Sequence, residues 1–246
     1  MNSISPNLNL MIKASEKASK ILIRDFGELE KLQVSLKGPN NFVTNADRKA
    51  EEIIISELEK SKKNFSILTE ESGFIEKKDK ENFWIVDPID GTTNFLNGVP
   101  HFCISIALLV DEEIIAGVTY DPIKDEIFFA EKNNGSYLNN KSIRVSQKNK
   151  IHDCLYGVNF KNNLPENFLI RNTGSAALDL AYVSSGRFDG CLQKNVNLWD
   201  IAAGSLLIKE AGGIVDNFEL KKFNKISIKA SNERISGDLN KKINIF

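Results

Sequence analysis

The sequence predicts a mixed α/β protein, of the α+β or layered α/β kind, built from two lobes. Its first segment has apolar residues at helical spacing, its middle is typical of antiparallel strands, and its last part mixes both without strict βαβ alternation. With 246 residues, of which 41% are hydrophobic, the chain can bury a large core. We place the N-terminal lobe at about residues 1–146 and the C-terminal lobe at about 147–246.

The N-terminal lobe is expected to begin with two helices. Apolar and small residues recur at helical spacing from Leu8 to Leu22, which predicts an amphipathic helix ending near Gly27. The stretch "KGPNNFVTNAD" should then form turns. Residues 47–63 are predicted to form the second helix, with Asp47 capping or preceding its first turn.

Strands are expected to follow these helices. A short strand, "FSILTEES", should break at Ser72 and Gly73. The charged stretch from Gly73 to Asn82 lacks periodicity, so we expect a mobile loop there. "FWIVD" should be a buried strand that Pro88 ends, because proline cannot donate to a sheet ladder. Residues 102–146 favour antiparallel hairpins.

The C-terminal lobe is expected to combine strands and helices. The pattern predicts strands near residues 154–160, 188–193, 213–217 and 226–231, and helices over 175–186 and 200–213. Gly212 and Gly213 mark the place where the last of these helices should stop.

Composition restricts the possible partners and compartment. Positive and negative side chains nearly cancel (32 Lys and Arg, 33 Asp and Glu), which argues against nucleic acid or an anionic membrane as the partner. The N-terminus lacks a signal-peptide pattern and no apolar run is long enough for a membrane span, so we expect a cytoplasmic protein. Cys103, Cys154 and Cys191 are far apart and are interpreted as buried apolar residues in a reducing compartment.

The stretch "DPIDGTTN" concentrates groups that can bind ions. Asp87 and Asp90 can face one point, with the carbonyl of Ile89 between them, and Gly91 allows a ligand close to the backbone. The amides of Gly91, Thr92 and Thr93 can form a nest for an anion, particularly if a helix begins there. Oxygen ligands without nearby histidine or cysteine favour Mg²⁺ over zinc. A capped surface turn explains this motif alone about equally well.

Further acidic residues stand at the ends of other apolar elements. Glu70 and Glu71 end a strand, Asp200 follows Trp199 at the start of a helix, and Asp47 precedes another helix. Each has an ordinary structural explanation, such as a solvated strand end or an acid favoured by the helix dipole. Together they favour a shared cation site.

Five stretches of the sequence resemble one known family. "WIVDPIDGTTNFLNGVPHFCISIAL" and "LWDIAAGSLLIKEAGG" are similar to the two signature motifs of the inositol monophosphatase family. "KGPNNFVTNAD", "ILTEESG" and "RNTGSAALDLAYVSSGRFDG" match other stretches of that family in the same order. The resemblance covers essentially the whole chain, 1–246, as one domain, and is closest to the bacterial inositol-1-monophosphatase branch. It implies a layered αβαβα sandwich of the sugar-phosphatase type and a homodimer.

The resemblance also implies roles for individual residues. It makes the following residues magnesium ligands, for two ions and a weak third: Glu70, Asp87, Asp90, Asp200 and the carbonyl of Ile89. Thr92, supported by Asp47 and Glu70, would orient the attacking water, while Gly91, Thr92 and Thr93 contact the phosphate. Gly174, Ser175 and Ala176 would touch the alcohol part of the substrate. His101 would shape the loop after the first motif, and His152 would be structural or lie on the surface.

Two positions depart from the family pattern. Asn41 stands where an aspartate is usual, which puts the third magnesium ion in doubt. Gln193 stands where a glutamate commonly accepts hydrogen bonds from inositol hydroxyls, and Lys194 follows it. Glutamine is a weaker acceptor than a carboxylate, so inositol selectivity is expected to change.

The predicted function is a Mg²⁺-dependent phosphomonoesterase that hydrolyses inositol 1-phosphate, or a similar small polyol phosphate, with metal-activated water. Histidinol phosphate is the main alternative, because Gln193 suits a substrate that is not a polyol. Fructose 1,6-bisphosphate and nucleotide phosphates are further alternatives within related families. An interaction protein associated with RNA polymerase antitermination complexes is an alternative of another class. Arg187 is expected either to serve a dimer interface or to pair with Asp189.

Overall fold

The computed structural model describes residues 4–29, 39–161, 164–220 and 223–243, with the side chains of 39–44 left out. Its helices have the following bounds: α1 (Pro6–Gly27), α3 (Pro39–Leu58), α4 (Thr92–Leu96), α5 (Ala176–Ser184), α6 (Leu198–Glu210), α7 (Glu233–Lys242) and a 3₁₀ turn, η1 (Ile151–Asp153).

The larger sheet has eight strands in the order β2-β1-β3-β4-β5-β6-β7-β8. They are β1 (Phe65–Thr69), β2 (Gly73–Ile75), β3 (Asp79–Asp90), β4 (Cys103–Val110), β5 (Glu113–Asp121), β6 (Glu126–Glu131), β7 (Ser136–Leu138) and β8 (Lys141–Ser142). Only the β1–β3 pair is parallel; the other neighbours are antiparallel, as the hairpin prediction for residues 102–146 requires.

The smaller sheet has five strands in the order β10-β9-β11-β13-β12. They are β9 (Leu155–Val158), β10 (Leu169–Arg171), β11 (Gly190–Val196), β12 (Gly213–Val215) and β13 (Ile226–Asn232). β10, β9 and β11 run parallel, whereas β13 is antiparallel to both β11 and β12.

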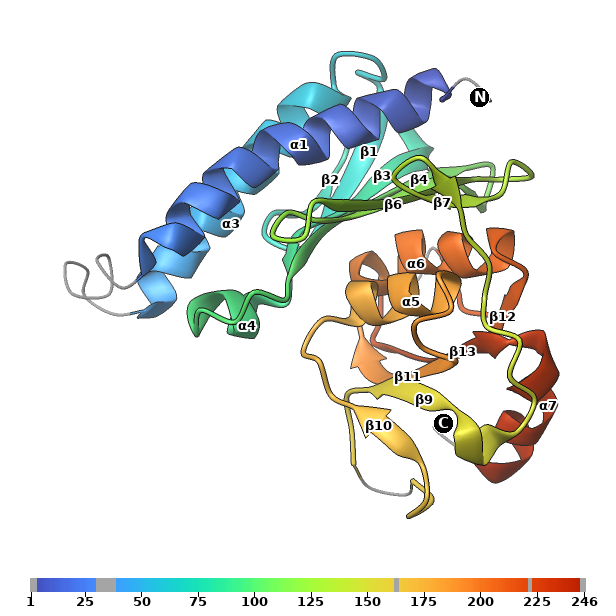
Figure 1. The fold of residues 1–246 in the computed structure, drawn as a ribbon. Helices are drawn as coiled ribbons and strands as arrows, with labels where there is room; N and C mark the ends of the chain where they lie inside the picture. Colours follow the sequence, from blue (N-terminus) through green and yellow to red (C-terminus); the bar gives the residue numbers. More distant parts are fainter. Residues whose placement is uncertain (1–3, 30–38, 162–163, 221–222, 244–246) are drawn as a thin grey trace.

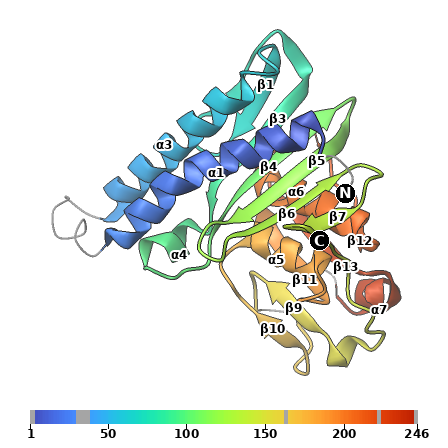
Figure 2. The same ribbon diagram turned by 45° about the horizontal axis from the view of Figure 1, so that its top comes forward.

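The elements form five layers, as Figure 1 shows. Helices α1 and α3 cover one face of the large sheet, and α5 and α6 lie between its other face and the small sheet. Helix α7 lies on the outer side of the small sheet, and Figure 2 shows the same order after a 45° turn. The αβαβα sandwich expected from the family resemblance is therefore confirmed.

Helix α3 begins earlier than predicted. It already includes Pro39, so Asp47 lies inside the helix and does not cap it. Ala46, Ala50 and Ile54 follow one another at four-residue spacing, and all are fully buried. Burial of this face against α1 and the sheet outweighs the turn preference of the asparagines and threonine before it.

The expected loop over residues 73–82 is also partly wrong. Gly73–Ile75 pairs with β1 as β2, and β3 begins at Asp79. Ser66 links the two segments, because its hydroxyl donates to the carbonyl of Asp79 (2.7 Å) and accepts from the amide of Lys77 (3.0 Å). The stretch lacked a period of two because it joins a three-residue strand to the irregular start of β3, where the pairing with β1 shifts register.

Pro88 does not end its strand. β3 continues to Asp90, and its pairing with β4 shifts register between Asp87 and Asp90. Pro88 lies inside this irregular stretch, where the ladder does not need an N–H donor. The irregularity changes the direction of Asp87 and Asp90, which a regular strand would point to opposite faces of the sheet.

Besides β2, the sequence patterns did not assign η1, β10 and α7, and they raised α4 only as a condition of the anion nest. β10 and α7 lie at the periphery of the small sheet (Figure 1). The stop of α6 is confirmed: the helix ends at Glu210, and Gly212 has a φ of 82°.

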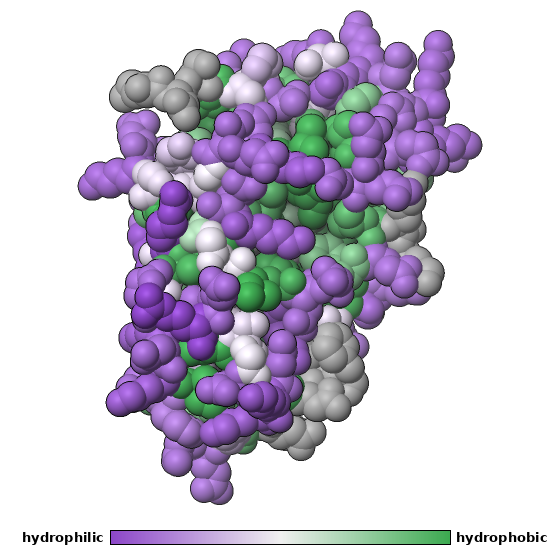
Figure 3. Space-filling model, turned by 90° about the vertical axis from the view of Figure 1, so that its right-hand side faces the viewer, coloured by the Kyte–Doolittle hydropathy of each residue, from purple (hydrophilic) through white to green (hydrophobic). Residues whose placement is uncertain are grey.

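The face of the molecule seen in Figure 3 is mainly hydrophilic, with scattered apolar side chains. Figure 3 shows apolar patches between hydrophilic residues on one face of the molecule. The large exposed apolar residues are Ile4, Ile23, Val99, Ile123, Leu169, Ile214 and Phe223. Within the described parts of the chain, no helix combines the length and apolarity needed to cross a membrane.

The close approach of α5 and α6 generates a prediction about stability. A Cβ atom at Gly204 would lie 2.5 Å from the Cβ atom of Leu180 on α5. Gly204→Ala should therefore lower the free energy of unfolding by about 1–3 kcal/mol, although alanine favours a helix more than glycine. Denaturant unfolding measures this change. The control is Gly237→Ala in α7, where a Cβ meets nothing within 4 Å and stability should rise by about 0.5–1 kcal/mol. A Gly204→Ala protein as stable as the wild type would contradict the prediction.

Candidate active site

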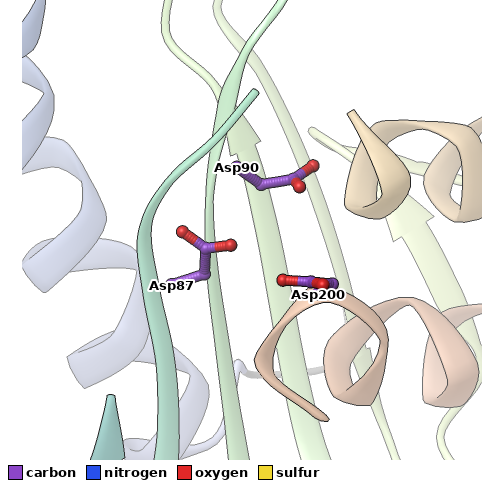
Figure 4. A group of neighbouring side chains, drawn as sticks. All are labelled: Asp87, Asp90 and Asp200. Carbon is purple, nitrogen blue, oxygen red and sulfur yellow. The ribbon is translucent and has the colours of Figure 1, made fainter. Parts of the chain in front are cut away.

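Three aspartates from distant parts of the chain meet between β3 and α6. One carboxylate oxygen from each of Asp87, Asp90 and Asp200 lies within 4.8 Å of those from the other two. Figure 4 shows the three side chains directed toward a common space, two from the strand and one from the helix. The expected convergence of these carboxylates is present, whereas their role as metal ligands stays a prediction.

Hydrogen bonds position each of these carboxylates. Asp87 Oδ1 accepts from the amide of Ile89 at 3.0 Å. Asp90 Oδ2 accepts from the hydroxyl of Ser175 and from the amide of Ala177, the latter at 2.8 Å. Asp200 occupies the N3 position of α6 and accepts from the amide of Asn197 at 2.7 Å in a capping box. The cluster thus joins the large sheet to the first turns of both middle helices.

The acidic side chains raise one another's pKa. Burial raises the pKa of Asp87 well above its usual value, and the charges of Glu70 and Asp90 add to this. Burial and the charge of Asp200 raise the pKa of Asp90 to about 7, against the effect of its hydrogen-bond donors. The pKa of Asp200 is also raised by burial. Such a group is stable when it holds protons or cations.

Glu70 extends the cluster from the end of β1. Its carboxyl group and that of Asp87 affect each other's pKa, and the pKa of Glu70 rises to about 7. The main cause is burial of the carboxyl group, although the residue as a whole keeps an exposed surface. The charge of Asp200 raises the pKa further.

Helix α3 contributes two acids, one of which the sequence analysis did not single out. Asp47 is 4% exposed, and burial followed by the charge of Glu71 raises its pKa to about 8. Glu51, one turn later, accepts hydrogen bonds from the hydroxyls of Thr69 and Ser72 and from the amide of Glu71 (3.1 Å). Glu51 therefore holds the turn that carries Glu70. The signal for Glu51 was its spacing of four from Asp47, because residues at this spacing lie on one face of a helix that contains both.

The turn after Asp90 has the backbone that its glycine predicts. Gly91 has a φ of 98°, and a Cβ there would lie 3.0 Å from the carbonyl oxygen of His101. Helix α4 begins at Thr92, whose hydroxyl donates to the carbonyl of Ile89 at 2.9 Å. Thr93 is exposed. Phosphate contacts of this turn stay a prediction.

The turn before α5 lies beside the cluster. Ser175 caps α5 and bonds Asp90, Gly174 has a φ of 83°, and Ala176 is the first helical residue. The amide of Asn94 on α4 donates to the carbonyls of His101 (2.7 Å) and Thr173 (2.8 Å). These bonds bring the proposed substrate turn next to the proposed metal site.

Gln193 lies on β11 and is only 1% exposed. Its Nε2 donates to Asp179 Oδ2 at 2.9 Å. The side chain therefore presents almost no surface to a substrate in this conformation, and its predicted direct contact stays untested.

The other singled-out residues lie outside the carboxylate cluster. Arg187 pairs with Glu126 (2.6 Å) and does not pair with Asp189, whose carboxylate binds Lys148 at 2.9 Å. The three cysteines are buried thiols, and Cys103 Sγ lies 3.8 Å from Asp90 Oδ2. The ring of His101 contacts that of Tyr182, and His152 is exposed. The side chain of Asn41 falls outside the described part of the chain.

The raised pKa values generate a prediction for the metal-free protein. Between about pH 5 and 8 the folded carboxyl groups of Glu70 and Asp90 retain protons that the unfolded chain has released. The free energy of unfolding should therefore fall as the pH rises through this window. Thermal unfolding with a chelator should give a Tm that decreases from pH 5 to 8, and added Mg²⁺ should raise Tm more at pH 8. A Tm that rises with pH in the chelated protein would contradict this assignment.

Comparison with known proteins agrees with this arrangement. The model of the inositol monophosphatase family matches residues 4–244. The inositol-1-monophosphatase of Mesorhizobium japonicum is 46% identical over 86% of this chain and 85% of its own length. The Nus factor SuhB of Escherichia coli K12 is 39% identical over 87% of this chain and 85% of its own length.

Solved structures match along almost the whole chain. The extragenic suppressor protein suhB of Bartonella henselae has a TM-score of 0.86 at 42% identity and covers 97% of this chain and 99% of its own. The inositol monophosphatase of Anabaena (Nostoc) sp. PCC 7120 has a TM-score of 0.81 at 33% identity, covering 96% and 94%. The chain therefore belongs to the inositol monophosphatase family.

Proposed function

We propose that this protein is a Mg²⁺-dependent phosphomonoesterase that hydrolyses inositol 1-phosphate or a similar small polyol phosphate. The observation that carries the proposal is the convergence of Asp87, Asp90 and Asp200, with one oxygen from each within 4.8 Å of the others. Family membership and relatives named inositol-1-monophosphatase support the same reaction.

The donor set fits a hard divalent cation. The cluster offers carboxylate oxygens alone, and their raised pKa values reflect the cost of holding this much negative charge in a buried place. We assign Glu70, Asp87, Asp90, Asp200 and the carbonyl of Ile89 as the ligands of two Mg²⁺ ions, with a third weaker ion left open. Bound Mg²⁺ would supply charge neutralisation at the phosphate and activation of water.

The chain's own residues would orient the reactants. The backbone of Gly91, Thr92 and Thr93 would bind the phosphate, and the turn 174–176 would contact the alcohol part. The Thr92 hydroxyl is held by the carbonyl of Ile89, which aims it for positioning water. Asp47 and Glu70 would support Thr92 in orienting the attacking water. The water oxygen bonds to phosphorus as the ester bond breaks, and the alcohol leaves with a proton.

Asp90 provides the most direct test of the site. Asp90→Asn removes one negative charge but keeps an oxygen that can accept from Ser175 and Ala177. We expect kcat/KM for phosphate release to fall by roughly 100-fold or more, because a metal ligand is weakened. Asp111→Asn, an exposed turn residue with a φ of 50°, is the matched control and should keep full activity. Wild-type turnover by the Asp90→Asn protein would refute the ligand assignment.

The substrate class follows from a screen of phosphate release with and without Mg²⁺. Inositol 1-phosphate, glycerol 2-phosphate, histidinol phosphate, fructose 1,6-bisphosphate and 3′-phosphoadenosine nucleotides cover the candidate alcohol groups. We expect the highest Mg²⁺-dependent kcat/KM for a polyol monoester. Preference for histidinol phosphate would establish the main alternative. Failure to hydrolyse any of these esters would reject the proposed reaction.

A role in transcription is a second candidate, because several relatives carry the name Nus factor SuhB. The two roles separate experimentally: Asp90→Asn should abolish hydrolysis and leave any association with RNA polymerase unchanged. We also retain the homodimer as a proposal, to be tested by analytical ultracentrifugation.

A further inference from the structure

A chain of buried hydrogen bonds leads from Gln193 to the turn before α5. Gln193 Nε2 donates to Asp179 Oδ2 at 2.9 Å, and the hydroxyl of Thr173 donates to Asp179 Oδ1 at 2.7 Å. Asp179 is 2% exposed, and its two oxygens are thus divided between β11 and the turn. Among the described residues, this carboxyl group is the hydrogen-bonded link between Gln193 and Thr173.

The same turn is held from its opposite side. The carbonyl of Thr173 accepts from Asn94 Nδ2 at 2.8 Å, and a Cβ at Gly174 would lie 2.9 Å from that nitrogen. Ser175 then donates to Asp90. Residues 173–175 are therefore clamped between the helix that follows the aspartate motif and the buried Asp179–Gln193 pair.

An amide at position 193 suits this arrangement better than a carboxyl group. Asp179 is already surrounded by protein, and burial raises its pKa to about 8. A second carboxyl group at position 193 would meet Asp179 at hydrogen-bond distance without a cation among the partners described for either side chain. An N–H donor from Gln193 bonds Asp179 Oδ2 directly, whereas a carboxyl group at position 193 could bond it only by holding a proton between the two groups.

We propose that Gln193 is a positioning residue for the alcohol part of the substrate: through Asp179 it holds the 173–175 turn, and it does not bind the substrate itself. This inference rests on the proposed function, since the turn is expected to contact the alcohol. Selectivity for the alcohol part of the substrate then depends on the position of residues 173–175. The carbonyl Oε1 of Gln193 is buried without a hydrogen-bond partner among the described residues. If Gln193 instead contacted the substrate directly, this oxygen is the atom that would accept from it.

The test compares Gln193→Met, which keeps an unbranched side chain without the donor, with Thr173→Val, which removes the other bond to Asp179. Both should raise KM for inositol 1-phosphate by about fivefold, the loss of one ordinary hydrogen bond, with little change in kcat. The double variant should be no worse than either single one, because the bonds act in series. KM for methyl phosphate, whose alcohol part is too small to use the turn, should not change. Hydrogen exchange of the backbone amides of residues 173–177 should accelerate in all three variants.

Leu192→Val is the matched control on the same strand. Leu192 is fully buried in an apolar cluster that does not include the 173–175 turn. The variant should therefore lose stability without changing KM or the hydrogen exchange of residues 173–177. Gln193→Glu separates the two mechanisms. Positioning through Asp179 predicts a higher KM for inositol 1-phosphate, whereas direct contact with inositol hydroxyls predicts a lower one.

Each outcome decides the matter. A lower KM for Gln193→Glu, additive single effects, or an unchanged exchange rate of residues 173–177 in Gln193→Met would overturn the proposal. If the wild type hydrolyses neither these two esters nor the others of the screen, the proposed function fails, and no variant is needed to see it. The exchange measurement still determines in that case whether Gln193 holds the turn.

Discussion

Electrostatic repulsion within the carboxylate cluster is the constraint on which the rest of the structure depends. Two unit charges 4.8 Å apart repel by roughly 3–4 kcal/mol at an effective dielectric constant of about 20, and three such groups meet here. The fold must therefore hold the acids in place by other means. It does so with donors on Asp90 and Asp200, and by anchoring the backbone that carries Asp87 and Glu70.

The layered architecture explains how this repulsion is tolerated. Helices α5 and α6 present their first turns to the cluster, Ser175 and Ala177 from one and Asp200 from the other. Their packing against both sheets is apolar and close, with Gly204 allowing the two helices to approach. Apolar burial in the middle layer thus supplies the free energy that offsets the assembly of like charges.

Most of the fold was predictable where periodicity was strong. The helix from Leu8 to Leu22, the hairpins of the large sheet and the stop of α6 near Gly212 correspond closely to the patterns. The errors lie where tertiary packing outweighs local preference. The start of α3 is rich in turn-forming residues but buries Ala46, and Pro88 fits into β3 because the ladder is irregular there. The peripheral strand β10 has three residues and gives no clear period, and α7 buries two apolar residues, Ile235 and Leu239, which make too weak a pattern.

The sequence by itself determined which residues are candidates for the chemistry: acids at the ends of apolar elements, a glycine turn with hydroxyls, and a family pattern along the whole chain. Motif spacing suffices for this, because Asp87 and Asp90 are separated by one short turn. The tertiary structure alone decided how remote groups are used. It placed Asp200 beside β3 and directed the amide of Gln193 to Asp179. It also placed Glu51 where it accepts a hydrogen bond from the turn that carries Glu70. Such contacts join residues far apart in the chain, and their direction depends on packing that no local pattern contains.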